Sequence, residues 1–183
     1  YYENYPACGG RSVHKFGLRA TREFAEARYK IRRFIGAEKI EEIVFTKNAT
    51  EAINLVANSL NLKKGDVVLT TDHEHNSNLV PWLVLSERTG IKHTIAKSND
   101  DTTFNMKTFE KALDKNVRLV SMVHVSNLDG VTVPAREIIK LAHEHDALVM
   151  LDGAQSAPHM KVNVKDLEVD FFAFSIHKMC GPS

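Results

Sequence analysis

Stretches with a helical repeat of apolar residues alternate along this chain with short apolar stretches typical of strands. In residues 20–35, for example, Phe24, Ala27 and Ile31 recur on one face, which is the spacing of an amphipathic helix. Helices are predicted at residues 20–35, 50–60, 78–89, 106–113 and 135–145, and strands at residues 43–46, 66–71, 91–96, 118–125, 148–151 and 171–174. This alternation predicts an α/β fold, in which a mostly parallel sheet lies between two layers of helices.

Polar residues follow five of the predicted strands at the point where each strand ends. They are Asn48 and Thr50, residues 72–76, Ser126 and Asn127, Asp152 and Gln155, and Ser175, His177 and Lys178. Sheets of this kind bind ligands beyond the carboxyl ends of their strands. We therefore expect these side chains to surround one site.

Lys178 and Asp152 suggest chemistry most directly. Lys178 follows the apolar strand 171–174, and a lysine held in an apolar pocket becomes nucleophilic because its charged form is disfavoured. A solvated surface lysine is the ordinary alternative. Asp152 ends the apolar strand 148–151, so its carboxylate is expected to be partly buried and to need a partner. It could cap a turn that starts at Gly153, or it could hold a protonated ring nitrogen.

The segment that leads into the helix at 50–60 offers a place for an anion. The first backbone N–H groups of a helix lack partners within the helix and favour negative charge, so a phosphate could bind there. A plain helix cap by Asn48 or Thr50 explains the same residues equally well.

The histidines allow a metal site, but the sequence does not favour one. His73 and His75 alternate on an extended segment, yet no complete ligand set and no cysteine cluster accompany them. We therefore predict no metal. His75, at a strand end, is better placed to lie as an aromatic plate over a flat cofactor.

Composition excludes several classes of protein. The 183 residues include 24 Lys and Arg against 23 Asp and Glu, so the basic excess of a nucleic-acid binder is absent. No apolar run approaches the roughly 20 residues of a membrane span, so no membrane partner is expected. The two cysteines, Cys8 and Cys180, form no CxxC pair, which favours a reducing, cytoplasmic location. The length suits a single domain over residues 1–183.

Five motifs in order along the chain carry a resemblance to a known family. They are FTKNATEAIN at 45–54, EHNSNLVPW at 74–82, HVSN at 124–127, DGAQ at 152–155 and SIHK at 175–178. In this combination the chain resembles the class V aminotransferase family of fold-type I pyridoxal-phosphate (PLP) enzymes. Within that family it is most similar to the cysteine desulfurase and selenocysteine lyase branch.

The resemblance implies a role for each matched residue. Three would be catalytic: Lys178 would form the Schiff base with PLP, Asp152 would pair with the pyridine nitrogen, and His75 would stack on the ring. The other implied contacts are Gln155 to the ring oxygen, Ala49, Thr50, Ser175 and His177 to the phosphate, Asn127 to the ring oxygen and the substrate carboxylate, and His14 near the substrate.

The resemblance also implies an activity. The enzyme would remove sulfur or selenium from a cysteine-type amino acid and leave alanine and an enzyme persulfide. A homodimer and a sulfur-acceptor protein, as in iron–sulfur cluster assembly, would be its partners. A class V aminotransferase or kynureninase-like enzyme, or a non-catalytic scaffold domain, are the alternatives.

Two further expectations concern the extent of the chain and its substrate. The persulfide-forming cysteine, the substrate-binding arginine, the last part of the sheet and the small domain would lie outside this chain. It would then be a partial large domain, inactive alone. Asp129 stands where the branch usually has an apolar residue. Together with residues 5–10 (YPACGG), this departure indicates a divergent subgroup and leaves the substrate open.

Overall fold

The computed structural model of this chain describes residues 1–10 and 13–181. They fall into two compact units, Tyr1–Phe45 and Thr46–Ser183, and each unit is described by itself. The single domain over residues 1–183 remains a prediction. None of the described helices is long and apolar enough to cross a membrane.

The first unit is built on one long helix, α1 (Lys15–Ile35). His14 caps its start, because the imidazole Nδ1 accepts a hydrogen bond from the backbone N–H of Gly17 at 3.3 Å. The helix ends at Gly36, which adopts the left-handed conformation with φ of 70° that glycine tolerates best. The predicted end is therefore confirmed, while the start lies five residues earlier than the apolar repeat indicated. A short 3₁₀-helix, η1 (Ile40–Glu42), follows.

The strand predicted at residues 43–46 is wrong, since no strand forms there. Its apolar residues serve a different contact. The ring of Phe45 packs edge-on against Phe24 of α1, with 4.9 Å between ring centroids, and Ile43 is buried while Val44 is exposed. The short apolar stretch thus reflects packing against a helix rather than pairing in a sheet.

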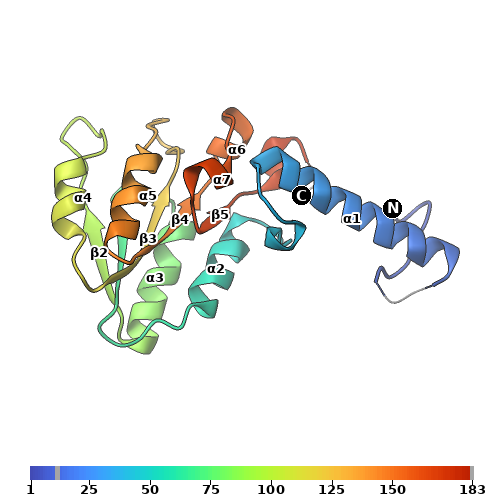
Figure 1. The fold of residues 1–183 in the computed structure, drawn as a ribbon, viewed down its shortest axis with the longest axis horizontal. Coiled ribbons are helices and arrows are strands. Elements are labelled where there is room, and N and C mark those ends of the chain that lie inside the picture. Colours follow the sequence, from blue (N-terminus) through green and yellow to red (C-terminus); the bar gives the residue numbers. More distant parts are fainter. Residues whose placement is uncertain (11–12, 182–183) are drawn as a thin grey trace. The chain divides into compact units, whose positions relative to one another are not determined.

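The second unit contains a five-stranded parallel sheet in the order β2-β1-β3-β4-β5, which confirms the predicted fold class (Figure 1). The strands are β1 (Val67–Thr71), β2 (Lys92–Ala96), β3 (Val117–Val123), β4 (Leu148–Asp152) and β5 (Phe171–Ala173). β3 ends two residues before the predicted position, where its neighbour β4 also ends, since Val123 is paired with Asp152.

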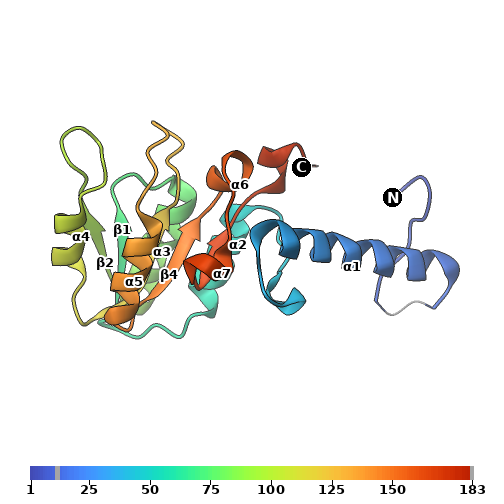
Figure 2. The same cartoon turned by 45° about the horizontal axis from the view of Figure 1, so that its top comes forward.

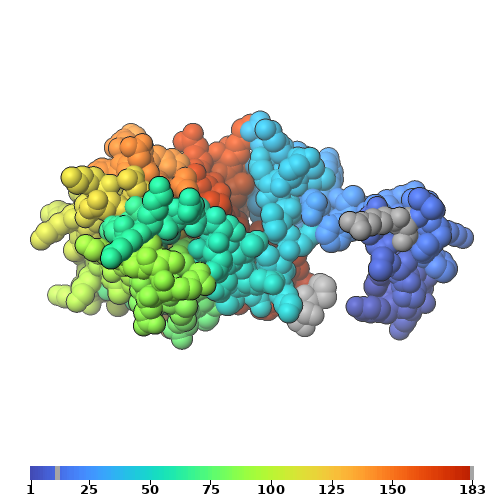
Figure 3. All heavy atoms as spheres, turned by 90° about the horizontal axis from the view of Figure 1, so that it is seen from below, coloured from blue at the N-terminus to red at the C-terminus, as the bar shows by residue number. Residues whose placement is uncertain are grey.

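Helices cover both faces of this sheet. They are α2 (Ala49–Ser59), α3 (Asn76–Thr89), α4 (Met106–Ala112), α5 (Ala135–Glu144), α6 (Ser156–His159), α7 (Val164–Leu167) and the 3₁₀-helix η2 (Ile176–Met179). Along β4, Val149 and Leu151 join the core under α4 and α5, whereas Met150 joins the core under α2 and α3. Figure 2 shows these two helix pairs on opposite sides of the sheet, and Figure 3 shows the α2 and α3 side chains next to one another on one surface.

Gly153, directly after β4, occupies a place where no side chain fits. A Cβ atom added there would lie 2.1 Å from Cζ of Phe172, a half-buried ring on the neighbouring strand β5. We predict that Gly153→Ala lowers the free energy of unfolding by about 1–3 kcal/mol, because the ring must leave its place in the core. Chemical denaturation of the protein measures this change.

The paired variant Gly153→Ala/Phe172→Leu provides the control. Its smaller side chain makes room for the new methyl group, so the cost of Gly153→Ala should be smaller in the Phe172→Leu background than in the wild type. Equal costs in both backgrounds would contradict the steric explanation.

Candidate active site

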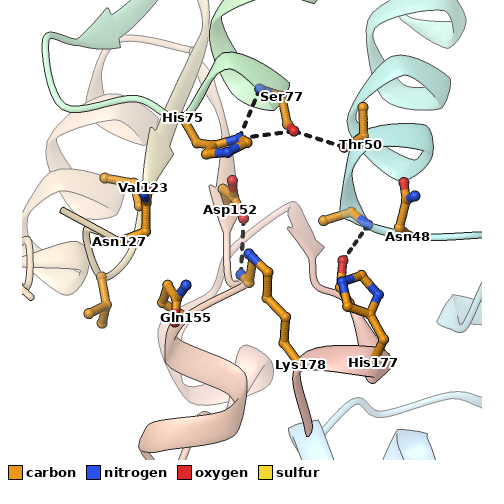
Figure 4. Close-up of a pocket in the computed structure, with 14 residues that line it drawn as sticks. Asn48, Thr50, His75, Ser77, Val123, Asn127, Asp152, Gln155, His177 and Lys178 are labelled. Carbon is orange, nitrogen blue, oxygen red and sulfur yellow. Dashed lines mark hydrogen bonds between the residues drawn. The ribbon is translucent and has the colours of Figure 1, made fainter. Parts of the chain in front are cut away.

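The carboxyl ends of the parallel strands surround a pocket of about 300 Å³ (Figure 4). Nine of the residues predicted for the site line it: Ala49, Thr50, His75, Asn127, Asp152, Gln155, Ser175, His177 and Lys178. The lining also includes Asn48, Ser77, Val123, Val125 and Ala154. The structure thus brings together residues that are up to 129 positions apart in the chain, from Ala49 to Lys178 (178 − 49). The roles of the individual residues remain predictions.

Asp152 lies at the centre of this arrangement, as the last residue of β4. It is 4% exposed, so the predicted burial is confirmed. Burial raises the pKa of its carboxyl group, and the backbone N–H of Ala154, Lys178 and His75 act in the opposite direction. Its Oδ1 accepts from that N–H at 2.9 Å. Asp152 therefore does stabilise the following turn, and its carboxyl group also lines the pocket.

Lys178 lies in η2, directly after β5, and its side chain extends toward Asp152 (Figure 4). Its backbone N–H donates to the carbonyl of Ser175 at 3.1 Å. Lys178 is exposed, as are Ile176 and His177 of the same turn. The expected apolar enclosure of Lys178 is therefore wrong for the described residues.

The start of α2 forms another wall of the pocket and is rich in hydrogen-bond donors. Asn48 caps the helix, since its Oδ1 accepts from the backbone N–H of Glu51 at 3.0 Å, so the cap considered from the sequence is present. The N–H of Ala49 donates to Ser175 Oγ at 2.8 Å, and the hydroxyl groups of Thr50 and Ser77 are 2.8 Å apart. Hydroxyl and N–H groups at a helix start suit an anionic group.

His75 caps α3 from the other side of the pocket. Its Nδ1 accepts from the backbone N–H of Ser77 at 3.1 Å and lies 3.0 Å from Ser77 Oγ. These two contacts tie the imidazole ring to the first turn of α3. Sequence reasoning missed Ser77, although its place in the first turn of a helix that begins after His75 is a signal for capping contacts.

His14 belongs to the first unit, so its predicted place near the substrate remains a prediction. His73 lies in the turn after β1, with Nδ1 3.4 Å from Asp129 Oδ2 and Nε2 3.9 Å from Asp72 Oδ1. The acid that departs from the branch pattern therefore has a partner within this chain. Within residues 1–10 and 13–181, no group of three or more His, Cys, Asp or Glu side chains could hold a metal ion.

Glu74 is a titratable group of this region that sequence reasoning did not single out. Its Oε1 accepts from Thr71 Oγ1 and its Oε2 from Asn78 Nδ2, both at 2.6 Å. Burial raises the pKa of this carboxyl group to about 7, and the neighbouring charge of Asp152 acts in the same direction. Hydrogen bonds from Thr71, Asn78 and the backbone of Val123 partly offset the rise.

This shift predicts a dependence of stability on pH. The pKa of Glu74 is higher in the folded state, at about 7, than its ordinary value of 4.5. Stability from this group is therefore complete below pH 4.5 and is lost as the pH rises through 7, by about 3 kcal/mol in all. Glu74→Gln cannot ionise, so its advantage over the wild type should grow between pH 5 and pH 8. Urea denaturation of the cofactor-free protein at both pH values measures it.

Glu137→Gln is the matched control, because Glu137 is exposed on α5. Its difference from the wild type should stay constant over the same pH range. A constant difference for Glu74→Gln as well would show that Glu74 ionises normally in the folded protein.

Comparison with known proteins agrees with the predicted resemblance and fold. The family described as aminotransferase class-V matches residues 1–183. A probable cysteine desulfurase of Halalkalibacterium halodurans is 46% identical over 186 residues, which cover 100% of this chain and 46% of the relative. A probable cysteine desulfurase of Synechocystis sp. is 43% identical, over 100% of this chain and 44% of the relative.

Solved structures give the same result. The apo structure of a cysteine desulfurase from Thermococcus onnurineus is similar with a TM-score of 0.92 and 42% identity, over 100% of this chain and 46% of the other. A mutant of the protein C-DES, with glycine covalently linked to its PLP cofactor, has a TM-score of 0.88 and 26% identity over 99% of this chain and 47% of the other. The chain thus spans about half the length of the relatives that it matches. Because the family matches all of it, the chain belongs to the class V aminotransferase family.

Proposed function

We propose that the protein containing this chain is a PLP-dependent cysteine desulfurase. The observation that carries the proposal is the shared pocket of a buried carboxyl group, Asp152, and an amine, Lys178, at the ends of adjacent strands. The relatives named as cysteine desulfurases, at 41–46% identity over the whole chain, support it.

The donors and acceptors of the pocket fit PLP. The buried carboxyl group of Asp152 suits a protonated pyridine nitrogen, which is the partner that a desolvated carboxylate needs. The phosphate would lie at the start of α2. It would be held there by the N–H of Ala49, the hydroxyl groups of Thr50 and Ser175, and the side chain of His177. When bound, PLP supplies an electron sink for the electrons released at the substrate α-carbon.

Each of the residues around the cofactor would then have its own role in the reaction. Lys178 would hold the cofactor covalently and, once the substrate amine replaces it, its amine would take the α-proton as general base. Asp152 would keep the proton on the ring nitrogen. His75 would pack on the ring face, Gln155 would donate to the ring oxygen, and Asn127 would lie near the substrate carboxylate.

The remaining parts of the proposal concern the whole protein. The substrate would be cysteine or a similar amino acid, and the thiol that accepts its sulfur would lie outside this chain, as would the arginine that binds the substrate carboxylate. We further propose that the whole protein is a homodimer in the cytoplasm. It would pass its sulfur to an acceptor protein and act in iron–sulfur cluster assembly. This chain by itself would be inactive.

The test uses the full-length protein, L-cysteine and a thiol reductant that releases the persulfide sulfur as sulfide. We expect alanine and sulfide in equal amounts and a near-visible absorbance band from bound PLP. Lys178→Ala should lose the band of the covalent cofactor and lower the rate about 10²–10⁴-fold, because it removes the proton-transferring amine. Lys161→Ala, at an exposed position outside the pocket, should leave both unchanged.

Other outcomes would overturn the proposal. Amino-group transfer to a keto acid without sulfide would indicate an aminotransferase. Cleavage of kynurenine would indicate a kynureninase-like enzyme, and the absence of a PLP band would indicate a scaffold domain. An unchanged band and rate in Lys178→Ala would show that another lysine holds the cofactor.

A further inference from the structure

Glu74 directly precedes His75 in the chain, yet its side chain takes part in a separate, partly buried set of contacts. Its two carboxyl oxygens accept from the side chains of Thr71, the last residue of β1, and Asn78, in the first turn of α3. One carboxyl group therefore joins the end of the strand to the start of the helix. The turn between them, which carries His75, is closed by these two contacts.

The contacts continue into the centre of the sheet. Asn78 Oδ1 accepts from Ser121 Oγ of β3 at 2.6 Å and from Trp82 Nε1 at 3.4 Å. All three of these residues are fully buried. Because buried polar groups are costly to leave without partners, this chain of hydrogen bonds fixes its members firmly. Glu74 thus lies at one end of a chain of hydrogen bonds that reaches β3.

Glu74 and His75 are neighbours in this turn, and their side chains have different surroundings. The carboxyl group of Glu74 contacts Thr71 and Asn78, while the imidazole of His75 lines the pocket (Figure 4). Its contacts with Ser77 orient the ring only relative to α3, whereas Glu74 fixes the start of α3 relative to the sheet.

Hydrogen bonding, rather than charge, holds Glu74. The charged group that acts on it from outside its own turn is the carboxylate of Asp152 on β4, and that charge raises its pKa together with burial. Its hydrogen-bond partners Thr71 and Asn78 are neutral. Glutamine has the same shape, and it can accept from Asn78 Nδ2 while its NH2 group donates to Thr71 Oγ1, so it should serve at position 74.

We propose that Glu74 is a positioning residue that holds His75 over the cofactor site by tying the turn after β1 to α3. This inference rests on the proposed function, because it gives the His75 ring a place on the face of bound PLP.

The test is a double-mutant cycle on the full-length protein, read out as the dissociation constant of PLP and the circular dichroism of its absorbance band. His75→Ala should weaken PLP binding about tenfold, the order expected from losing one aromatic contact. Glu74→Ala should weaken it by about the same factor in the wild type but by less than about twofold in the His75→Ala background. Glu74→Gln should restore both the affinity and the dichroic signal.

Ser121→Ala is the control for a purely structural role, because it removes a buried hydrogen bond of the same network without touching Glu74 or His75. It should lower the melting temperature and leave PLP affinity within about twofold. If Glu74→Ala fails to fold, Glu74→Asp replaces it, since its shorter side chain cannot reach Thr71 and Asn78 together.

Two results would overturn the inference. One is an equal loss of affinity from Glu74→Ala with and without His75, and the other is a loss from Ser121→Ala as large as that from Glu74→Ala. The inference rests only on the PLP-binding part of the proposed function. If that part fails, the result differs, because the wild-type protein would then bind no PLP at all.

Discussion

The burial of one carboxyl group at the end of β4 is the constraint on which the site depends. A carboxylate at Asp152 loses most of its hydration, and this cost must be offset by groups around it. The N–H of Ala154 lies two residues on, while Lys178 and His75 come from the ends of other strands and favour the charged form. The arrangement therefore needs a parallel sheet, because only then do these strand ends lie at one edge.

Gly153, the residue after Asp152, meets a second, steric requirement at the end of β4. Gly153 leaves room for the ring of Phe172, which lies where a Cβ atom would be, and its N–H donates to the carbonyl of Ala173 at 2.7 Å. The backbone of β4 and β5 can thus stay close just beyond the paired residues, which keeps η2 and Lys178 beside Asp152. The Asp-Gly-Ala sequence is accounted for by charge, space and a hydrogen-bond donor, in that order.

The sequence was sufficient to predict the sheet and most of the pocket, because both follow from local patterns. Apolar strands such as 148–151 and polar residues directly after them are visible without knowledge of tertiary contacts. The strand expected at 43–46 was wrong because Phe45 packs on Phe24, and a short apolar stretch does not show whether it pairs in a sheet or packs on a helix. The short helices α6 and α7, of four residues each, are too brief to show a period.

Contacts between different segments of the chain could not be predicted from local patterns. The contacts of Glu74 with Asn78 and the exposure of Lys178 depend on which segments meet, and no spacing along the chain records that. Asp129 shows the opposite case, since it was conspicuous in the sequence. In the structure it pairs with His73 and does not line the pocket.

Asp152 and Glu74 both carry a carboxyl group near the pocket, but the groups that surround them differ. Burial raises the pKa of both. Asp152 has an amine and an imidazole nearby that favour its ionised form, whereas Glu74 has only neutral donors and the charge of Asp152 itself. The surroundings of Asp152 therefore favour a negative charge more than those of Glu74 do. A charge at Asp152 would lie where a cationic ring nitrogen would meet it.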